Sequence, residues 1–446
     1  MLNRPRILAA LLAALLATGL LSACGSTSEP APAGLTYSTT LGIYTVGVAI
    51  TPNTPTSTGG AITSYTVSPI LPVGLALNGT TGVISGTPTT PTARTAYTVT
   101  GSNGSGSTST AMTLGVPGFA ATGSMTVARS AARVALLANG KVLVTGGYDA
   151  DGFDLASAEL YDPATGTFSS TGNMNVRRAS FTATLLQSGK VLVAGGYFLP
   201  IGSPSAEVFD PATGTFSVTG SMTVERTGHV AALLPNGKVL LAGGRDRAGD
   251  SLASAELYDP VTGTFAATGN MTTARGTTVG ALLASGKVIV TGGSGPSAEV
   301  YDSSTGVFSS TGSMAIARYM HYAVTLLSSG KVLVSGSMFS DPIAELYDPA
   351  TGLFATTGSM ITGREQQAAI LLASGRVLEA GGRPIQDIPL ASAELYDPTT
   401  GAFSSAGNLR TARKEAAAIL LQSGAVLVAG GRGDNGTLSS AELYYE

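Results

Sequence analysis

The sequence predicts an all-β protein in which a seven-bladed β-propeller follows a small β-sandwich. Charged residues make up only 11% of the chain, against about 25% in an average globular protein, and glycine is abundant at 59 residues. Apolar residues occur in short runs between turn residues, without helical periodicity. A segment with a double glycine recurs seven times in the second part of the chain, at spacings of 44 to 49 residues.

Each copy of this repeat contains the pattern of four short strands. An alternating stretch after a repeated arginine is the first strand, and the turn Ser-Gly-Lys or Asn-Gly-Lys leads into an apolar second strand. A third strand reads Ala-Glu-Leu-Tyr, and Asp-Pro-x-Thr-Gly turns the chain into a fourth strand with one inward aromatic residue. Four strands per repeat are typical of a propeller blade, which must stack in a ring because it cannot bury both faces alone. The double glycines begin at Gly146, Gly195, Gly243, Gly292, Gly336, Gly381 and Gly430, and only the fifth copy departs from the pair, with Ser337 in second place.

The ends of the repeat region predict how the ring closes. The last copy stops at its third strand, Ala441-Glu442, whereas Phe119 begins a fourth strand that has no first three strands before it. We therefore expect the strand at Phe119 to complete the last blade, because this closure covers sheet edges that would otherwise be exposed.

Residues 35–116 contain β-rich runs separated by Gly, Pro, Asn and Ser turns, as expected of a small β-sandwich. The run from Leu71 to Asn78 (LPVGLALN) and the run from Thr81 to Pro88 (TGVISGTP) resemble the signature of immunoglobulin-like domains in bacterial surface proteins. The resemblance implies an immunoglobulin-like spacer or adhesion module, and we name no site residue in it.

The repeat of residues 117–446 resembles the kelch family in its double glycine, its tyrosine in the third strand and its aromatic residue in the fourth. Phenylalanine stands where kelch blades often carry tryptophan, which this chain lacks. A seven-bladed kelch-type β-propeller beside an immunoglobulin-like domain also resembles the architecture of galactose oxidase. That family needs a tyrosine crosslinked to a cysteine and two histidine ligands, and the one cysteine, Cys24, lies outside the propeller. The resemblance therefore does not extend to the copper radical cofactor.

Residues 1–23 have the pattern of a signal peptide. Two arginines precede an apolar stretch, Ile7 to Leu21, which is too short for a comfortable membrane-spanning helix. The run Leu21-Ser22-Ala23-Cys24 resembles the bacterial lipobox, in which the cysteine carries lipid; an ordinary signal peptide with an incidental cysteine is the alternative. Residues 24–34 are then the lipidated cysteine and a flexible tether. We expect an exported lipoprotein of the cell envelope, anchored at the outer membrane or cell surface.

The composition also excludes several classes of site. A net charge of −3 without a basic stripe argues against nucleic-acid binding. A single cysteine allows neither an intrachain disulfide nor a cysteine-based zinc cluster, and two histidines, His229 and His321, are too few for a metal site built mainly on imidazole. The run from Asp149 to Asp154 resembles part of a calcium-binding loop, but it lacks the full ligand spacing of such a loop and its terminal bidentate glutamate. We expect no cofactor and no metal.

Two sets of repeated charges are expected to be structural. Arginines begin the first strand and glutamates the third strand, on the same face of the disc, and seven unpaired arginines near the axis would repel one another. We therefore expect each arginine to pair with a glutamate, with an anion-binding channel mouth as the alternative. Lysines and aspartates of the turns form a second set on the opposite face, where the aspartates are explained as turn formers. The arginines are Arg129, Arg178, Arg226, Arg275, Arg318, Arg364 and Arg413, and the glutamates are Glu159, Glu207, Glu256, Glu299, Glu345, Glu394 and Glu442.

The loops between the second and third strands differ in length and chemistry among the copies. Because binding residues usually lie on loops of a rigid scaffold, we place the binding surface on the face that carries these loops. An aromatic arc facing a basic arc suits a polar, acidic polymer or a protein surface, and ordinary solvated loop residues are the alternative. The ligand-binding candidates are Tyr148, Phe153, Tyr197, Phe198, Phe339, Arg245, Arg247, Arg383 and Arg432.

These features predict an exported binding or interaction module without catalytic residues. Its partner is expected to be a protein or a glycan at the cell envelope, with membrane contact through the lipid anchor only, and the protein is expected to be a monomer. The alternative is a carbohydrate-active hydrolase or lyase on the same face, using spare carboxylates among Asp154, Asp250 and Asp434. A third reading is a docking subunit of an envelope assembly, because the fold alone does not decide the function.

Overall fold

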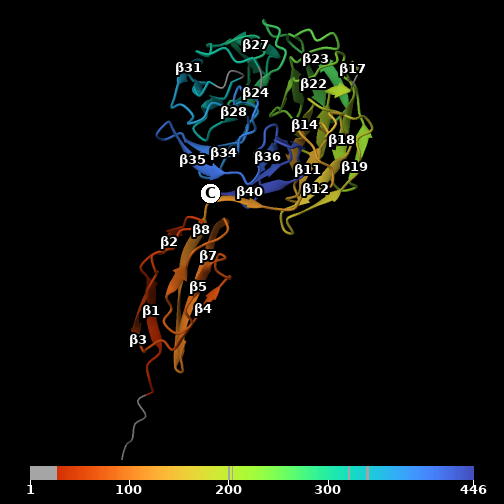
Figure 1. The fold of residues 1–446 in the computed structure, drawn as a ribbon. Coiled ribbons are helices and arrows are strands. Elements are labelled where there is room, and N and C mark those ends of the chain that lie inside the picture. Colours follow the sequence, from red (N-terminus) through yellow and green to blue (C-terminus); the bar gives the residue numbers. More distant parts are fainter. Residues whose placement is uncertain (1–27, 199–200, 203, 320–321, 338–340) are drawn as a thin grey trace, which may run out of the picture. The chain divides into compact units, whose positions relative to one another are not determined.

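The computed structural model describes residues 28–198, 201–202, 204–319, 322–337 and 341–446. The described residues form strands, turns and irregular segments and contain no helix, which confirms the prediction of an all-β chain. Accordingly, this part of the chain offers no helix with the length and apolarity needed to cross a membrane. The predicted signal peptide and Cys24 lie outside the described residues. Two compact units make up the chain (Figure 1), and each is described by itself.

The first unit comprises described residues up to 42 together with 48–87 and 95–114. Its four-stranded sheet has the order β2-β8-β7-β4, and the pairs β1-β3 and β5-β6 complete it. Its inward side chains alternate along the two long strands, where Tyr97, Val99, Met112 and Leu114 are at most 4% exposed. These strands are β1 (Pro32–Tyr37), β2 (Leu41–Ile43), β3 (Pro55–Gly59), β4 (Ser64–Ser68), β5 (Leu75–Leu77), β6 (Ile84–Gly86), β7 (Thr92–Asn103) and β8 (Gly106–Val116).

The described part of the second unit contains seven four-stranded antiparallel sheets. Each inner strand contacts the inner strands of the sheets before and after it, and the last contacts the first, so the sheets form a closed ring (Figure 1). This arrangement is the expected β-propeller.

The bounds of the strands follow the repeat closely. The inner strands are β10 (Arg133–Leu136), β14 (Thr182–Leu185), β20 (Val230–Leu233), β24 (Val279–Leu282), β28 (Ala323–Leu326), β32 (Ala368–Leu371) and β36 (Ala417–Leu420). The second strands are β11 (Val142–Thr145), β15 (Val191–Ala194), β21 (Val239–Ala242), β25 (Val288–Thr291), β29 (Val332–Ser335), β33 (Val377–Ala380) and β37 (Val426–Ala429). The third strands are β12 (Ala158–Asp162), β18 (Ala206–Asp210), β22 (Ala255–Asp259), β26 (Ala298–Asp302), β30 (Glu345–Asp348), β34 (Ser392–Asp397) and β40 (Ala441–Tyr445). The outer strands are β13 (Thr167–Ser170), β19 (Thr215–Val218), β23 (Thr264–Ala267), β27 (Val307–Ser310), β31 (Leu353–Thr356), β35 (Ala402–Asn408) and β9 (Gly118–Ala121).

The ring closes through strand β9, as the sequence predicts. This strand pairs with β40 and supplies the outer strand of the sheet that also contains β36 and β37. Its aromatic ring occupies the usual place, since the ring centres of Phe119 and Tyr444 lie 4.9 Å apart, close to the 4.8 Å between Tyr161 and Phe168 within one repeat. Two segments at opposite ends of the propeller sequence therefore build one blade.

The second strands are apolar throughout because both of their faces are covered. In β11, Val142 and Val144 pack against the seventh sheet, whereas Leu143 between them packs with Val191 and Phe209 of the second sheet. Alternate side chains of a strand point to opposite faces, so a strand between two neighbouring blades has no solvent side. This packing explains the unbroken Val-Leu-Val runs.

The glycine pairs make the close approach between blades possible. A Cβ atom at Gly146 would lie 2.5 Å from the ring of Phe181 in the next blade, and one at Gly195 would lie 2.8 Å from the ring of His229. The second glycine of each pair has a positive φ, +90° at Gly147, and approaches backbone atoms of its own blade. An added side chain would therefore meet the next blade at the first position and the backbone of its own blade at the second.

Candidate functional site

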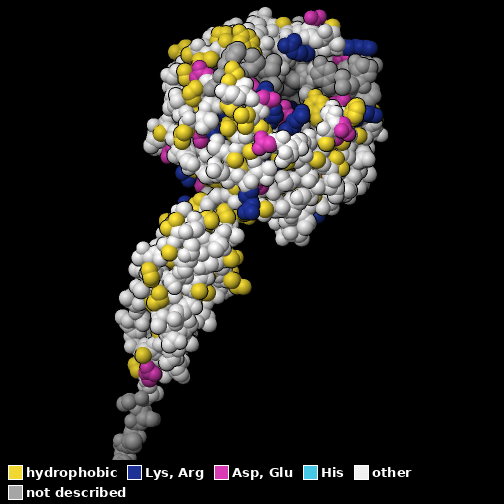
Figure 2. Space-filling model, in the orientation of Figure 1, with side chains coloured by type: hydrophobic (Ala, Val, Ile, Leu, Met, Phe, Trp, Pro, Cys, Tyr) yellow, Lys and Arg dark blue, Asp and Glu magenta, His cyan; other side chains and the backbone are white. Residues whose placement is uncertain are grey.

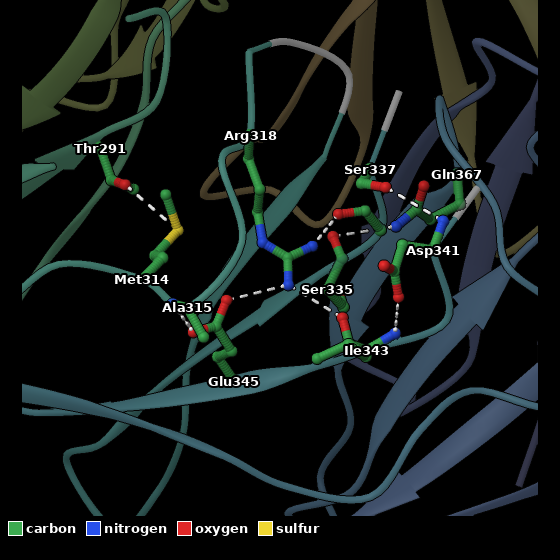
Figure 3. Close-up of polar contacts among 11 residues, drawn as sticks. Thr291, Met314, Ala315, Arg318, Ser335, Ser337, Asp341, Ile343, Glu345 and Gln367 are labelled. Atoms are coloured by element: carbon green, nitrogen blue, oxygen red, sulfur yellow. Dashed lines mark hydrogen bonds and ion pairs between the residues drawn. The ribbon is translucent and has the colours of Figure 1, made fainter. Parts of the chain in front are cut away.

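The seven repeated arginines are buried and ion-paired, which confirms the predicted pairing. Each is at most 1% exposed and lies 2.6 to 3.2 Å from the glutamate of its own repeat. The second terminal nitrogen of Arg129, Nη1, donates hydrogen bonds to the carbonyl oxygens of Gly146 and Ser157. Figure 3 shows the fifth copy, in which Arg318 lies between the carboxylate of Glu345 and the carbonyl oxygen of Ile343.

The paired glutamates also hold the connections between blades. The carboxylate of Glu159 accepts hydrogen bonds from the backbone N–H groups of Thr126 and Val127, at 2.8 and 3.1 Å. These residues belong to the connection that leads from β9 to the first inner strand. Burial lowers the pKa of Arg129, and the charge of Glu159 opposes this shift. The arginine–glutamate ring is thus part of the scaffold.

The repeated lysines and aspartates are paired as well. Lys141 lies 3.0 Å from Asp162, and the corresponding pairs of the next four copies lie 2.9 to 3.2 Å apart. The Asp162 carboxylate also accepts the backbone N–H of Ala164 within its turn. The hydrogen bonds from Lys141 and Ala164 lower the pKa of Asp162. A ligand-binding charge must therefore be sought outside both sets.

A cavity of about 440 Å³ lies where the inner strands begin. It is built from six of the seven repeats, and the corresponding residue of the fifth, Met320, lies outside the described residues. Basic and acidic side chains also gather next to one another near the middle of the visible face of this unit (Figure 2). The polar residues lining the cavity are Arg133, Tyr148, Ser180, Thr227, Arg245, Thr277, Gln366, Gln367 and Glu415.

The backbone around this cavity is left-handed at one repeated position. The second residue after the repeated arginine has a positive φ in five copies, and four of these residues are not glycine. Backbone hydrogen bonds join neighbours around the rim, from Ala131 N–H to Glu415 oxygen and from Glu415 N–H to Gln366 oxygen. Left-handed residues other than glycine are strained and cluster at functional sites, so this rim is the best candidate site of the propeller. The five residues are Ala131, Ser180, Gly228, Gln366 and Glu415.

The structure brings two predicted candidates, Tyr148 and Arg245, into this cavity. The guanidinium of Arg245 donates to the carbonyl oxygen of Gly249 at 2.7 Å and extends over Gly276 of the next repeat. A Cβ atom at Gly276 would lie 2.9 Å from that guanidinium, so the lack of a side chain at Gly276 makes room for the Arg245 side chain. A loop arginine thus reaches the rim because a neighbouring repeat has a glycine.

Arg383, a third candidate, is tied into an ion-pair network. Its guanidinium lies 2.7 Å from the carboxylate of Glu365 and also pairs with Asp387, which in turn pairs with Lys414. Its hydrogen bonds to Asp387 and the two nearby carboxylates raise the pKa of Arg383, although desolvation works against this shift. The positive charge of Arg383 is therefore already compensated within the protein.

The remaining candidates are not among the residues that line this cavity. Phe153 is 58% exposed, and Arg432 is exposed in the short hairpin of β38 (Arg432–Gly433) and β39 (Gly436–Thr437). Arg247 lines a separate hollow with Glu225 and Asp246. Tyr197 and Phe198 form β16 (Tyr197–Phe198), which pairs with β17 (Ile201–Gly202), and Phe339 lies outside the described residues.

Sequence reasoning missed the residues that follow each repeated arginine. Arg133, Gln366, Gln367 and Glu415 line the cavity, but they lie between the repeated arginine and the inner strand or, in the case of Arg133, at the first residue of that strand, not in the variable loops. The signal was available, because these positions differ among copies whose neighbouring residues repeat closely.

The residues present do not fit the copper site of the galactose oxidase architecture. The one cysteine, Cys24, precedes the propeller in the sequence, and both Cys24 and His321 lie outside the described residues. His229 is buried against Thr182, 3.0 Å from its hydroxyl, and burial together with Arg226 and Arg133 lowers the pKa of His229 to about 3. The described part of the chain holds no cluster of three or more His, Cys, Asp or Glu arranged for a metal ion.

The three carboxylates considered for a hydrolase do not lie at the cavity. Asp154, Asp250 and Asp434 are absent from its lining. In the loop that resembles a calcium site, the Asp149 carboxylate accepts the backbone N–H groups of Asp151 and Phe153, at 3.0 and 2.8 Å. Asp149 thereby stabilises its own turn.

Comparisons with known proteins agree with this description. Residues 27–117 match the family described as Putative Ig domain, and residues 130–175 and 226–272 match the Kelch motif. No curated protein sequence matches the chain. Among solved structures, a fungal alcohol oxidase of the AA5 family in complex with copper is similar, with a TM-score of 0.61 and 16% identity over 74% of this chain and 75% of that one.

At 16% identity this similarity concerns the fold alone. The kelch repeats and the Ig-like domain suggest a protein-interaction module. The chain therefore combines an N-terminal Ig domain with a kelch-repeat β-propeller of the fold seen in the galactose oxidase-like AA5 enzymes.

Proposed function

We propose that this chain is an exported binding module that engages a protein partner through the axial cavity and the loops around it. The observation that carries the proposal is the contrast between two kinds of charge. The repeated arginine–glutamate and lysine–aspartate sets are paired within the scaffold, whereas Arg133 and Arg245 at the cavity make no ion pair with described residues. Unpaired charges on a rigid rim are suited to recognition.

A protein partner is favoured by the repeat type, because kelch repeats generally mediate protein–protein interaction. The cavity lining combines a tyrosine, two arginines and several hydroxyl and amide groups, a composition typical of interaction hot spots. A glycan is the competing partner, and the experiment below separates the two.

Photo-crosslinking from the cavity tests this proposal. A photoreactive phenylalanine replaces Tyr148 in the full chain, and a matched variant carries it at Val261, which is 92% exposed in an Asp-Pro turn. We expect a discrete protein adduct in cell-envelope extracts from position 148 only, and its loss when Arg245→Ala is added. Equal labelling from both positions would refute the cavity as the binding surface. Retention on a glycan array that depends on Arg245, without a protein adduct, would assign the site to glycans instead.

We further propose that Cys24 carries a lipid that holds the module at the cell envelope. The proposal rests on the position of the only cysteine directly after Leu21-Ser22-Ala23, and on the Pro- and Ser-containing segment that follows. The test is incorporation of labelled fatty acid by the natural chain and by Cys24→Ser. Lipid labelling that survives Cys24→Ser, or membrane association without any labelling, would overturn the anchor.

A further inference from the structure

One position of the inner strands carries a charge in a single repeat. Arg133 begins β10, where the other repeats have small or apolar residues or a threonine. A cation at the start of one inner strand makes the ring asymmetric at the level of the cavity. The corresponding residues are Thr182, Val230, Val279, Ala323, Ala368 and Ala417.

The guanidinium of Arg133 is held in place but not neutralised. Its Nε donates a hydrogen bond of 2.8 Å to the carbonyl oxygen of Phe181 in the second repeat. This contact orients the group and leaves the two terminal nitrogens without a carboxylate among the described residues. The side chain is exposed to the solvent of the cavity, yet protein atoms surround it, and this desolvation lowers the pKa of Arg133. Coulomb attraction to an anion is stronger in such an enclosed place than on an open surface.

The other charged and polar groups of the lining are distributed unevenly among the repeats. Arg245 and the hydroxyl-bearing residues Ser180, Thr227 and Thr277 come from the second, third and fourth repeats. The one lining carboxylate, Glu415, comes from the seventh repeat, and the side-chain amide of Gln366 donates to it at 2.9 Å. A neutral amide thus holds Glu415, which makes no ion pair with either arginine, and both arginines keep an uncompensated positive charge at the cavity.

We propose that the axial cavity binds a carboxylate, received by the terminal nitrogens of Arg133 with Arg245 as second cation and the hydroxyl groups as neutral donors. A guanidinium pairs with a carboxylate through two parallel hydrogen bonds, which gives both affinity and orientation. The volume of about 440 Å³ suits a small dicarboxylate or a single acidic side chain of a partner. The inference rests on the proposed function, because both place recognition at this cavity. Carboxylate binding can nevertheless be disproved while the proposed interaction module stands.

Calorimetric titration of the full chain tests the inference with matched probes. Succinate and its uncharged diamide represent a free small ligand, and the capped peptides acetyl-Gly-Glu-Gly-amide and acetyl-Gly-Gln-Gly-amide represent a partner side chain. We expect the charged member of at least one pair to bind roughly tenfold or more tightly than the neutral one, with an affinity that falls as salt rises. Binding by the succinate pair alone identifies a free carboxylate, and binding by the peptide pair alone identifies a partner side chain.

Three variants make the test specific to Arg133. Arg133→Gln is expected to remove the preference for the charged probe, and Arg133→Thr, which introduces the residue of the second repeat, is expected to do the same with the fold preserved. Arg247→Gln, in the separate hollow, is the matched control and is expected to bind as the natural chain does. Equal affinity for charged and neutral probes, no binding of any probe, or unchanged preference in Arg133→Thr would overturn the inference. A partner adduct at position 148 that persists in Arg133→Gln would leave the proposed module standing without its carboxylate.

Discussion

The hydroxyl of Ser335 donates a hydrogen bond of 2.6 Å to the carboxylate of Glu379, across the seam between the fifth and sixth sheets. Glu379 is fully buried in β33, and its second carboxylate oxygen has no hydrogen-bond partner in the described part of the protein. Burial raises the pKa of Glu379 to about 7, although Ser335 and Arg364 favour the charged form. All other repeats have an apolar residue at this place, namely Val144, Val193, Leu241, Val290, Val334 and Val428.

This carboxyl group predicts a pH-dependent stability. Between pH 4.5 and about 7 the unfolded chain releases the Glu379 proton while the folded chain keeps it, so the free energy of unfolding falls as the pH rises. Glutamine does not titrate, so in Glu379→Gln we expect this fall in the free energy of unfolding between pH 4.5 and about 7 to be smaller by up to about 3 kcal/mol. Urea unfolding at several pH values measures it, with Glu29→Gln at an exposed position as control. Parallel pH profiles of the natural chain and Glu379→Gln would contradict the prediction.

Breaking one buried ion pair is expected to destabilise the propeller strongly. Arg178→Met leaves the carboxylate of Glu207 buried without its cation, at a cost of about 3 to 5 kcal/mol. The double variant Arg178→Met with Glu207→Leu is expected to recover most of that loss, because it removes both charges. Lys190→Met, in the half-exposed pair with Asp210, is expected to cost no more than about 1 kcal/mol. Denaturant midpoints of the three variants provide the comparison, and equal losses in Arg178→Met and Lys190→Met would argue against a structural ring.

Two glycines separate the effect of backbone strain from that of a steric clash. Gly189 and Gly196 both have a positive φ, +80° and +98°, but only a Cβ atom at Gly196 would meet other atoms, 2.6 Å from the Ala179 carbonyl oxygen. Gly189→Ala is expected to cost about 1 kcal/mol of backbone strain. Gly196→Ala is expected to cost at least about 2 kcal/mol more, because the clashing atom is backbone and cannot rotate away. Thermal unfolding of both variants checks the difference, and similar losses would show that the close approach can relax.

Five of the seven seams have a tyrosine–threonine hydrogen bond that the second seam lacks. The hydroxyl of Tyr258 lies 3.0 Å from that of Thr219 in the preceding blade, whereas the second repeat has Phe209 opposite Thr171. Phe209→Tyr is expected to stabilise the protein by about 0.5 to 1.5 kcal/mol through the added bond. Tyr258→Phe is expected to lose a similar amount, since Thr219 keeps its bond to the Gly263 carbonyl oxygen. A destabilising Phe209→Tyr would mean that the second seam has no room for the hydroxyl.

The propeller could be predicted from the sequence because its contacts repeat. The arginine–glutamate pairs lie within one copy of the repeat, and the aromatic pairs of six blades join strands that a single turn connects. A pattern that recurs seven times therefore reports the same local environment seven times. The pairing of β9 with β40 joins segments that are far apart in the sequence. It could still be predicted, because the last repeat has no fourth strand of its own and the strand at Phe119 has no first three strands before it.

The candidate site was predicted only in part, because it depends on where single copies depart from the pattern. Tyr148 and Arg245 were identified from the variable loops and do lie at the cavity. The ion pair of Arg383 with Glu365 could not be foreseen, since it joins a loop to the start of a strand. Arg133 was missed because the prediction considered only the variable loops, whereas Arg133 begins an inner strand.

By itself, the sequence determined the blades of the kelch-type propeller, its closing strand and its ring of paired arginines and glutamates. Those features depend on residues that are close along the chain or that occur in every repeat. Only the tertiary structure decided which charges remain free, because closing the ring brings the same position of distant repeats around one axis. Arg383 is paired with Glu365 and Asp387, whereas Arg133 and Arg245 make no ion pair with described residues. A charge is compensated or free according to its neighbours in space, which no single repeat contains.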